Sequence, residues 1–243
     1  MSTRLLVSGT LSNGAELILQ GEQARYLGRV LRSRVGDPVQ VFNSDDGEWS
    51  ALIENISKNT VTLRVEERNE TATESPLKIH FVQGISRGER MDFVVQKATE
   101  LGIKRLSPVL THHGVVKFDQ QRAEKRRRHW QQIANSASEQ CGRTRPPLVD
   151  APIALNSWFG AKDSVDSTEL ILKPGANVQL ASFAPPATKI CLLIGPEGGL
   201  SEREYEDANI AGFQAVALGP RILRTETAAL AAMTIAQSCW GDL

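Results

Sequence analysis

The pattern of apolar residues changes near residue 77, and this change limits the chain to two kinds of architecture. Before it, short runs rich in Val, Ile, Leu and Thr alternate with turn signals, as in AELILQ (15–20) and NTVTLRVEE (59–67). After it, apolar runs of strand length alternate with amphipathic stretches of helix length. The first pattern is typical of a small barrel of short strands. The second predicts an α/β unit with a mostly parallel sheet covered by helices.

The N-terminal part contains the turn chemistry of hairpins. Asn13-Gly14 and Asp45-Asp46-Gly47 fit hairpin loops, and one short helix is expected within residues 23–37. The polar segment ERNETATESP (67–76) is the best candidate for a linker. We therefore expect a barrel domain over residues 1–73 and a second domain over residues 74–243.

Start and stop signals mark several helices of the second domain. Residues 88–102 form an amphipathic stretch that ends at Gly102, and a long helix is expected over about 121–140. Ser201 and Glu204 have capping-box spacing, which predicts a helix start directly after a glycine-rich loop. Residues 225–240 predict a final helix rich in small residues.

Composition excludes several classes of protein. The apolar stretches ICLLI (190–194) and AALAAMTIA (228–236) are far too short to span a bilayer, so no membrane association is expected. The N-terminus has too short an apolar run for a signal peptide. The 3 cysteines form no CxxC and the 4 histidines have no ligand spacing, which predicts neither disulfides nor a metal. These features indicate a cytoplasmic protein.

The net charge of zero conceals an uneven distribution. Residues 76–128 contain 12 Lys/Arg and 5 Asp/Glu, and the positive charge peaks in AEKRRRHW (123–130). Both a solvated helix face and a patch that contacts phosphates fit this run. A neutral protein can bind nucleic acid when its positive charge lies on one side.

Two glycine loops follow expected strands, in LLIGPEGGLS (192–201) and VALGPRILRTETA (216–228). Loops at the carboxyl ends of parallel strands are where α/β sheets bind ligands. Neither loop has the lysine of a phosphate loop or the dinucleotide fingerprint, and Glu197 would repel a phosphate. Each could be only a tight turn. Together they favour a pocket for a ligand that carries hydrogen-bond donors or positive charge.

IGPEGGLSEREYE (194–206) and LGPRILRTETAALAA (218–232) resemble the signature segments of the RsmE-type small-subunit rRNA uridine methyltransferases, within the SPOUT superfamily. The resemblance extends over VLRSRVGDPVQVF (30–42), VVQKATELGIKRLSPVLT (94–111) and ANSASEQCGRTRPP (134–147), and so covers nearly the whole chain. It implies a C-terminal SPOUT α/β trefoil-knot domain, a small N-terminal PUA-like β-barrel and a homodimer. The chain departs from the family pattern at His112-His113-Gly114 and at Arg25-Tyr26, where the family often has a histidine.

The resemblance also implies S-adenosyl-L-methionine as cofactor and 16S rRNA, or the small ribosomal subunit, as substrate. The cofactor-binding residues carried over from it lie in the two glycine loops and in ILKPG (171–175); they are Leu172, Ile194, Gly195, Glu197, Gly199, Leu218, Gly219, Ile222, Leu223, Thr227 and Ala228.

Methylation of a uridine at ring nitrogen 3 requires a base for the imide proton and a cation for the charge left on the ring. Arg224 is our candidate for the cation, with Arg221 as support. Glu226 and Glu197 are the carboxylate candidates, and Glu226 is preferred because Glu197 could instead bind backbone amides within its own turn. Arg224, Glu226 and Arg221 are thus the expected catalytic residues.

A large RNA requires a phosphate-binding surface beyond the pocket. The arginines expected to contribute are Arg25, Arg29, Arg32 and Arg34 in the barrel, and Arg87, Arg90, Arg143 and Arg145 in the second domain. Three alternatives stay open: a ribose 2′-O-methyltransferase of the same superfamily, a non-catalytic RNA-binding module, and a nucleotide-binding enzyme with a degenerate loop.

Overall fold

The chain forms two compact units in a computed structural model that describes residues 3–70, 73–114, 119–162, 167–184 and 188–243. One unit comprises Met1–Glu74 and Ser138–Pro146, and the other Ser75–Ala137 and Pro147–Leu243. Part of the expected linker (67–76) lies outside the described residues. The segment 138–146, expected in the second domain, packs with the first unit instead. The boundary at residues 73 and 74 stays a prediction.

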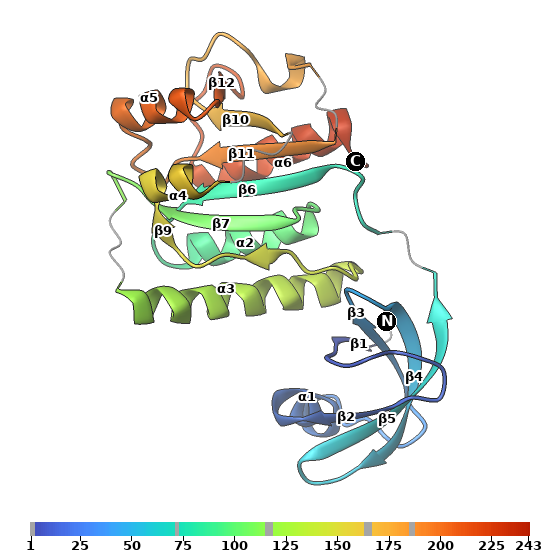
Figure 1. Cartoon of the computed structure of the whole chain (residues 1–243). Helices are drawn as coiled ribbons and strands as arrows, with labels where there is room; N and C mark the ends of the chain where they lie inside the picture. The colour runs from blue at the N-terminus through green and yellow to red at the C-terminus, as the bar shows by residue number, and fades with distance from the viewer. Residues whose placement is uncertain (1–2, 71–72, 115–118, 163–166, 185–187) are drawn as a thin grey trace. The chain divides into compact units, whose positions relative to one another are not determined.

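A curled five-stranded sheet forms the first unit, in the order β1-β3-β4-β5-β2 (Figure 1). Its strands are β1 (Thr3–Leu6), β2 (Glu16–Gln20), β3 (Pro38–Asn43), β4 (Gly47–Ile56) and β5 (Thr60–Asn69). Alternate residues of β5, Val61, Leu63 and Val65, are buried in its core, as the strand period requires. Among the described residues β1 and β2 do not pair with each other, so backbone pairing does not close the expected barrel.

The helix expected within residues 23–37 is shorter than the pattern indicated. An α-helical turn, α1 (Gly21–Arg25), continues into a π-helical turn, η1 (Tyr26–Val30). Leu27 is fully buried, whereas Tyr26 and Val30 are exposed. The helix cannot continue because a tight turn follows, in which the carboxylate of Asp37 accepts the backbone N–H of Arg34 at 2.6 Å.

The second unit contains a parallel sheet in the order β12-β10-β11-β6-β7-β8, with β9 also beside β7 (Figure 1). The strands are β6 (Lys78–Gly84), β7 (Arg105–Leu110), β8 (Leu148–Val149), β9 (Ile153–Ala154), β10 (Thr168–Leu172), β11 (Lys189–Ile194) and β12 (Gln214–Val216). Every pairing among them is parallel, which confirms the mixed α/β prediction.

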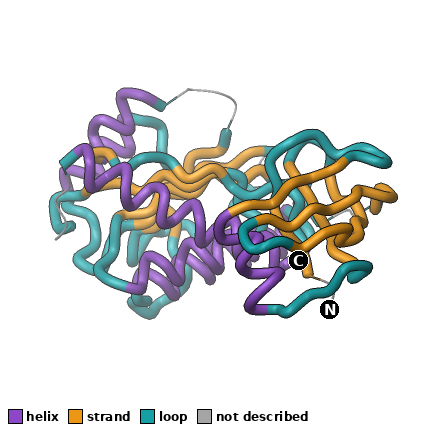
Figure 2. Tube along the Cα trace, turned by 90° about the horizontal axis from the view of Figure 1, so that it is seen from below, coloured by secondary structure: helices purple, strands orange, loops and turns teal. Residues whose placement is uncertain are grey.

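Helices cover both faces of this sheet, and they lie on either side of the strand layer in Figure 2. In β11, Ile190, Leu192 and Ile194 pack on one face, and Cys191 and Leu193 on the other. The first face is covered by α2 (Glu89–Glu100), α3 (Gln120–Cys141) and α6 (Thr225–Trp240), and the second by α4 (Leu155–Ala161) and α5 (Glu202–Ile210). Burial on both sides explains why β11 is a continuous apolar run.

Local signals at helix ends agree with the structure. The capping box at the start of α5 is present in full, since the Ser201 hydroxyl accepts the Glu204 N–H and the Glu204 carboxylate accepts the Ser201 N–H. Gly102 follows α2 with a φ of 84°, which favours glycine. A short 3-10 turn, η2 (Leu180–Ser182), precedes β11. Among the described residues, no helix is long and apolar enough to cross a bilayer.

Candidate active site

A cavity of about 510 Å³ lies at the carboxyl ends of β10, β11 and β12, beside the start of α6. Three segments form its walls: Leu172–Pro174 after β10, the glycine loop after β11, and the second glycine loop that leads into α6. The two glycine loops, separated in sequence, therefore face one pocket. The strand ends meet where parallel sheets usually bind ligands.

Most of the predicted cofactor residues line this cavity. They are Leu172, Ile194, Gly195, Glu197, Gly199, Leu218, Gly219, Ile222, Leu223 and Ala228, joined by the predicted catalytic residues Arg221, Arg224 and Glu226. Thr227 does not line the cavity, and its side chain is exposed on the first turn of α6. The helical turn directs Thr225 and Ala228 toward the pocket and Thr227 away from it.

Close backbone contacts explain several glycines around the cavity. A Cβ on Gly84, the last residue of β6, would lie 2.4 Å from Pro196 Cδ. A Cβ on Gly198 would lie 2.9 Å from His113 Cβ. Gly199 and Gly219 have φ values of 71° and 109°, a region that L-residues rarely adopt. The first glycine loop is thus both tightly bent and pressed against its neighbours.

The turn at His112-His113 supports this loop. Glu204, buried in the first turn of α5, accepts the backbone N–H of His112 at 2.8 Å through Oε1. The two imidazole rings contact each other edge to face at 4.9 Å and are exposed. His112 and His113, which depart from the family pattern, therefore lie where the backbone packs against Gly198.

Glu197 is held by hydrogen bonds. Its Oε1 accepts the backbone N–H of Arg87 at 2.9 Å and a guanidinium N–H of Arg90 at 3.2 Å. Partial burial raises the pKa of Glu197, but the backbone hydrogen bonds and Arg90 outweigh burial, so its pKa lies below the ordinary value. This carboxylate joins the glycine loop to the segment between β6 and α2.

Glu226 has a different environment. Among the described residues its Oε2 is buried without a hydrogen-bond partner, and the residue lines the cavity. Arg221 and Arg224 also line the cavity, both are exposed, and neither forms an ion pair with a described residue. An acceptor and two cations are therefore available to a ligand.

The pocket also contains residues that we did not predict as cofactor contacts. Lys173 Nζ lies 4.4 Å above the centre of the Tyr205 ring, and the Tyr205 hydroxyl donates to the Leu172 carbonyl at 3.4 Å. Burial, with the nearby Glu202 and Glu204, raises the pKa of Tyr205. Tyr205 could have been expected from its position one helical turn after Ser201. Arg90, predicted for RNA, lines the cavity as well.

The arginines of the first unit predicted to bind RNA are exposed. Arg25, Arg29, Arg32 and Arg34 all lie in or just after α1 and η1, and none forms an ion pair with a described residue. Arg32 has a φ of 53°, which is unusual for a residue with a side chain. Exposed Tyr26, Val30 and Leu31 lie among them.

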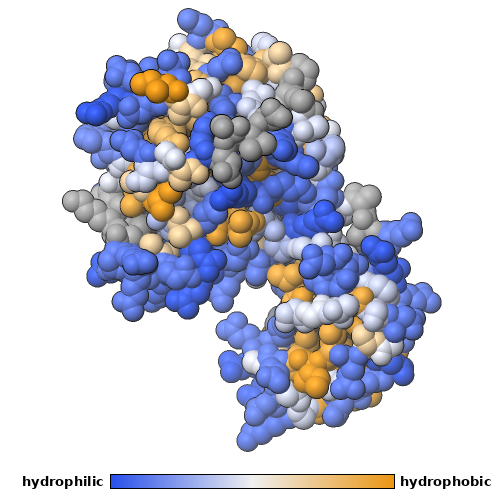
Figure 3. All heavy atoms as spheres, viewed as in Figure 1, coloured by the Kyte–Doolittle hydropathy of each residue, from blue (hydrophilic) through white to orange (hydrophobic). Residues whose placement is uncertain are grey.

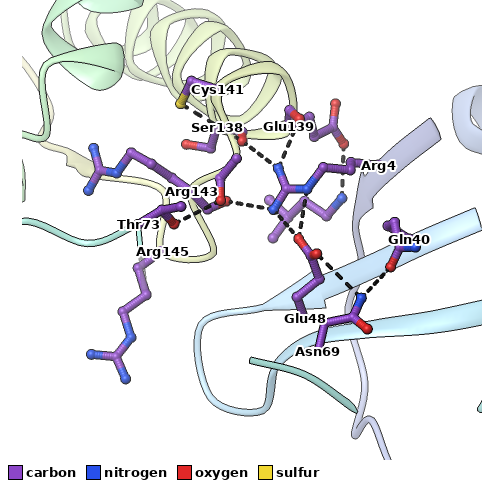
Figure 4. Close-up of polar contacts among 12 residues, drawn as sticks. Arg4, Gln40, Glu48, Asn69, Thr73, Ser138, Glu139, Cys141, Arg143 and Arg145 are labelled. Carbon is purple, nitrogen blue, oxygen red and sulfur yellow. Dashed lines mark hydrogen bonds and ion pairs between the residues drawn. The ribbon is translucent and has the colours of Figure 1, made fainter. Parts of the chain in front are cut away.

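Arg143 and Arg145 have opposite environments. Arg143 is 2% exposed, and its Nη2 lies 2.9 Å from Glu74 Oε2. Its carbonyl accepts from Arg4, which also donates to the carbonyls of Ser138 and Glu139 at 2.9 Å (Figure 4). Arg145 is exposed and extends away from this cluster (Figure 4). The burial of Arg143 argues against a phosphate contact for its side chain.

The basic run of α3 is partly neutralised. Glu124 Oε1 lies 2.7 Å from Arg127 Nη2 and 3.8 Å from Arg128 Nε, and His129 bonds Asp92. Hydrophilic side chains cover the visible surface of α3 (Figure 3). These contacts fit a solvated helix face and leave fewer free charges for RNA.

Two family models match the chain. A model described as an RNA methyltransferase domain matches residues 73–237, and one described as an RNA methyltransferase PUA domain matches residues 19–66. The first covers the whole cavity and the sheet beneath it.

Full-length relatives give the same match. The chain is 31% identical to ribosomal RNA small subunit methyltransferase E of Buchnera aphidicola from Acyrthosiphon pisum, over 98% of this chain and 94% of that protein. It is 37% identical, with a TM-score of 0.93 and full coverage of both chains, to the Neisseria gonorrhoeae protein of that name bound to S-adenosyl methionine. A Legionella pneumophila methyltransferase with bound SAM matches with the same identity, TM-score and coverage.

Proposed function

The chain belongs to the ribosomal RNA small subunit methyltransferase E family, and on that basis we propose that it methylates ring nitrogen 3 of a uridine in 16S rRNA, with S-adenosylmethionine as methyl donor. One observation of the structure carries this proposal: both glycine-loop signatures line a single cavity, and Arg224 and Glu226 stand at its wall.

The residues of the cavity fit the cofactor. Its volume of about 510 Å³ lies in the usual range for small-molecule sites. Backbone around Gly195, Leu218 and Gly219 would bind the adenine and ribose, and apolar Leu172 and Ile222 would cover them. The unpaired carboxylate oxygen of Glu226 is compatible with a cation nearby. When bound, S-adenosylmethionine supplies an electrophilic methyl group.

Glu226 and Arg224 have separate roles in the reaction at the uridine. Glu226 takes the imide proton, because its Oε2 has no competing donor among the described residues. Arg224 stabilises the negative charge that proton loss leaves on the ring oxygens, and Arg221 assists in binding. Glu197 is the weaker candidate for the base, since Arg87 and Arg90 already occupy its Oε1.

The RNA contacts come from exposed arginines on both units. Arg25, Arg29, Arg32, Arg34 and Arg145 bind phosphates from the PUA-like unit, and Arg87 and Arg90 bind from the second unit. Arg143 is left out because it is buried against Glu74. The reacting nitrogen lies on the pairing edge of the base, so the target uridine must be unpaired or rotated out of the helix.

Family membership also supports a trefoil knot in the second unit and a homodimer working in the cytoplasm. The small residue Ala231, half-buried on α6, would allow another helix to approach closely. Sedimentation equilibrium at micromolar concentration tests the dimer, and the mass of one chain would contradict it. An experimental structure tests the knot by the path of the chain through its loops.

The activity is tested by mapping methylation. Small-subunit rRNA from cells that lack this protein is incubated with the purified chain and S-adenosylmethionine, and modified positions are located by mass spectrometry. One uridine should gain a methyl group on its base. A ribose methyl would favour a 2′-O-methyltransferase instead, and the absence of S-adenosylmethionine binding in calorimetry would favour a non-catalytic RNA-binding module.

Substitutions separate chemistry from binding. Glu226→Gln and Arg224→Ala should each lower kcat by about 10²-fold or more, since a positioned base and a charge-stabilising group each contribute on that scale. S-adenosylmethionine affinity, measured by calorimetry, should change little in Glu226→Gln. Glu206→Gln, an exposed carboxylate on α5, is the matched control and should keep full activity. Near-normal turnover in both pocket variants would contradict the assignment.

A further inference from the structure

A buried polar cluster connects the strand layer with the wall of the cavity. We call it the Thr225 node; it consists of the Gln83 amide, the Thr225 hydroxyl and the Gly195 carbonyl. Thr225 Oγ1 donates to Gly195 O at 2.7 Å. Gln83 Nε2 donates to Thr225 Oγ1 at 3.0 Å and lies 3.3 Å from Gly195 O. Gln83 is fully buried and Thr225 is 5% exposed.

The node joins three segments that are far apart in sequence. Gln83 lies at the end of β6, Gly195 begins the first glycine loop, and Thr225 is the first residue of α6. The same part of β6 contacts the loop through Gly84 and Pro196. The node therefore sets the distance between the glycine loop and the start of α6.

Thr225 stands between Arg224 and Glu226, the two residues proposed to act on the uridine. Because Arg224 and Glu226 are its immediate neighbours in the chain, hydrogen bonds that fix the Thr225 side chain also limit the movement of both residues. Thr225 does not cap α6, because the N-cap residue is Arg224 and no side-chain cap bond is present there. Its hydroxyl instead donates a hydrogen bond to the Gly195 carbonyl of the glycine loop.

Packing alone does not account for Gln83. Among the described residues its Oε1 is buried without a hydrogen-bond partner, which costs stability that an apolar side chain of similar size would not lose. Unpaired buried polar atoms in native proteins often mark a functional demand. The Nε2 amide of Gln83 also donates to the Gly84 carbonyl at 2.8 Å, so it links the end of β6 to Thr225 and to the Gly195 carbonyl.

We propose that Thr225 and Gln83 are positioning residues for methyl transfer, holding Arg224 and Glu226 in register with the glycine loop. This inference rests on the proposed function. Neither residue exchanges a proton with the substrate. They act by keeping the base and the cation at the geometry in which the reaction is fast, where a misplacement of about 1 Å can cost 10²-fold in rate.

The test is an isosteric substitution. Thr225→Val keeps the shape of the side chain and removes the hydroxyl, so kcat should fall at least tenfold while the Kd for S-adenosylmethionine changes less than threefold. Thr225→Ser keeps the hydroxyl and should retain kcat within about threefold. Gln83→Met should resemble Thr225→Val. The double variant, Thr225→Val with Gln83→Met, should have a kcat no lower than that of the slower single variant, because both substitutions disrupt the same Thr225 node.

Thr99→Val is the matched control. The Thr99 hydroxyl is also buried and donates to the Val95 carbonyl at 2.8 Å within α2. The Thr99→Val substitution should lower the melting temperature without changing kcat. If Thr225→Val lowers only the melting temperature, the node is merely structural. If it abolishes S-adenosylmethionine binding, Thr225 is a cofactor ligand; either outcome overturns the proposal. Should Thr225→Val not fold, Thr225→Ser and Gln83→Met decide by the same criteria.

Wild-type protein is assayed first with S-adenosylmethionine and rRNA. An inactive wild type that binds no cofactor contradicts the proposed function itself. An active wild type with unaffected Thr225→Val and Gln83→Met turnover contradicts only the positioning role.

Discussion

Gly84 has no room for a side chain, because its neighbour across the sheet end is the backbone of the glycine loop. A Cβ there would lie 2.4 Å from Pro196 Cδ and 2.5 Å from Pro196 N. Gly84→Ala should push the loop out of place, lower S-adenosylmethionine affinity at least tenfold, and destabilise the fold by about 1–3 kcal/mol. Calorimetry and urea unfolding measure the two effects.

Gly160→Ala is the control for that substitution. Gly160 lies in α4, and a Cβ there would meet no atom within 4 Å. Alanine favours helix by up to about 1 kcal/mol over glycine, so this variant should be as stable as wild type or more stable. A Gly84→Ala protein that binds the cofactor like wild type would show that the loop tolerates displacement.

Which residues line the pocket was predictable only in part. The types at positions 221, 224 and 226 indicated a cation and a base near a glycine loop, and all three line the cavity. The partners of Glu197 could not be foreseen, because the N–H of Arg87 approaches it from 110 positions away. The burial of Arg143 was missed for the same reason: its partner Glu74 lies 69 positions away.

At the scale of elements, strong periodicity and good caps made prediction reliable. β11 reads as a continuous apolar run because both its faces are covered, and α5 begins at its capping box. The shortest elements were not predicted. β8 and β9 have two residues each, and α4 has seven, too few for a period to emerge. Backbone pairing with β7, not periodicity, defines β8 and β9.

The strand β6 contains a histidine that should make the free energy of unfolding depend on pH. His80 Nε2 lies 2.7 Å from Ser107 Oγ, and its ring contacts Trp158 of α4. Burial, assisted by Arg105, lowers the pKa of His80 from 6.5 to about 4, although Asp150 and Glu169 oppose the shift. The folded protein therefore prefers neutral His80.

Between pH 6.5 and about 4 the unfolded chain binds a proton at His80 that the folded chain does not. The stabilisation is complete above the unfolded pKa and is lost as pH falls through this window, by about 3 kcal/mol. Urea unfolding at pH 7, 5.5 and 4 should show a smaller loss for His80→Gln than for wild type. His113→Gln, an exposed histidine, should keep the wild-type slope. Equal slopes for all three proteins would refute the linkage.

At the scale of the whole molecule, charge that is not paired should govern RNA binding. Arg29 is exposed without an ion pair to any described residue, whereas Arg64 on the same unit lies 3.2 Å from Glu54. Arg29→Ala should weaken rRNA binding and reduce the slope of log affinity against log salt by about 1.

Arg64→Ala is the matched control and should leave that slope unchanged, because Glu54 already balances its charge. S-adenosylmethionine affinity should stay the same in both variants. Filter binding across a range of salt concentrations gives the slopes. An unchanged slope in Arg29→Ala would remove this arginine from the RNA surface.

The first unit is assembled from two separate stretches of the sequence, and this affects how it can be made. Arg4 and Leu6 find their partners at Ser138 and Glu139, more than 130 positions later. A chain synthesised from its N-terminus at about 5–20 residues per second therefore waits several seconds between completing the five strands and receiving the segment that finishes their unit. Although its five strands end at residue 69, the first unit is complete only after residue 146 has been synthesised.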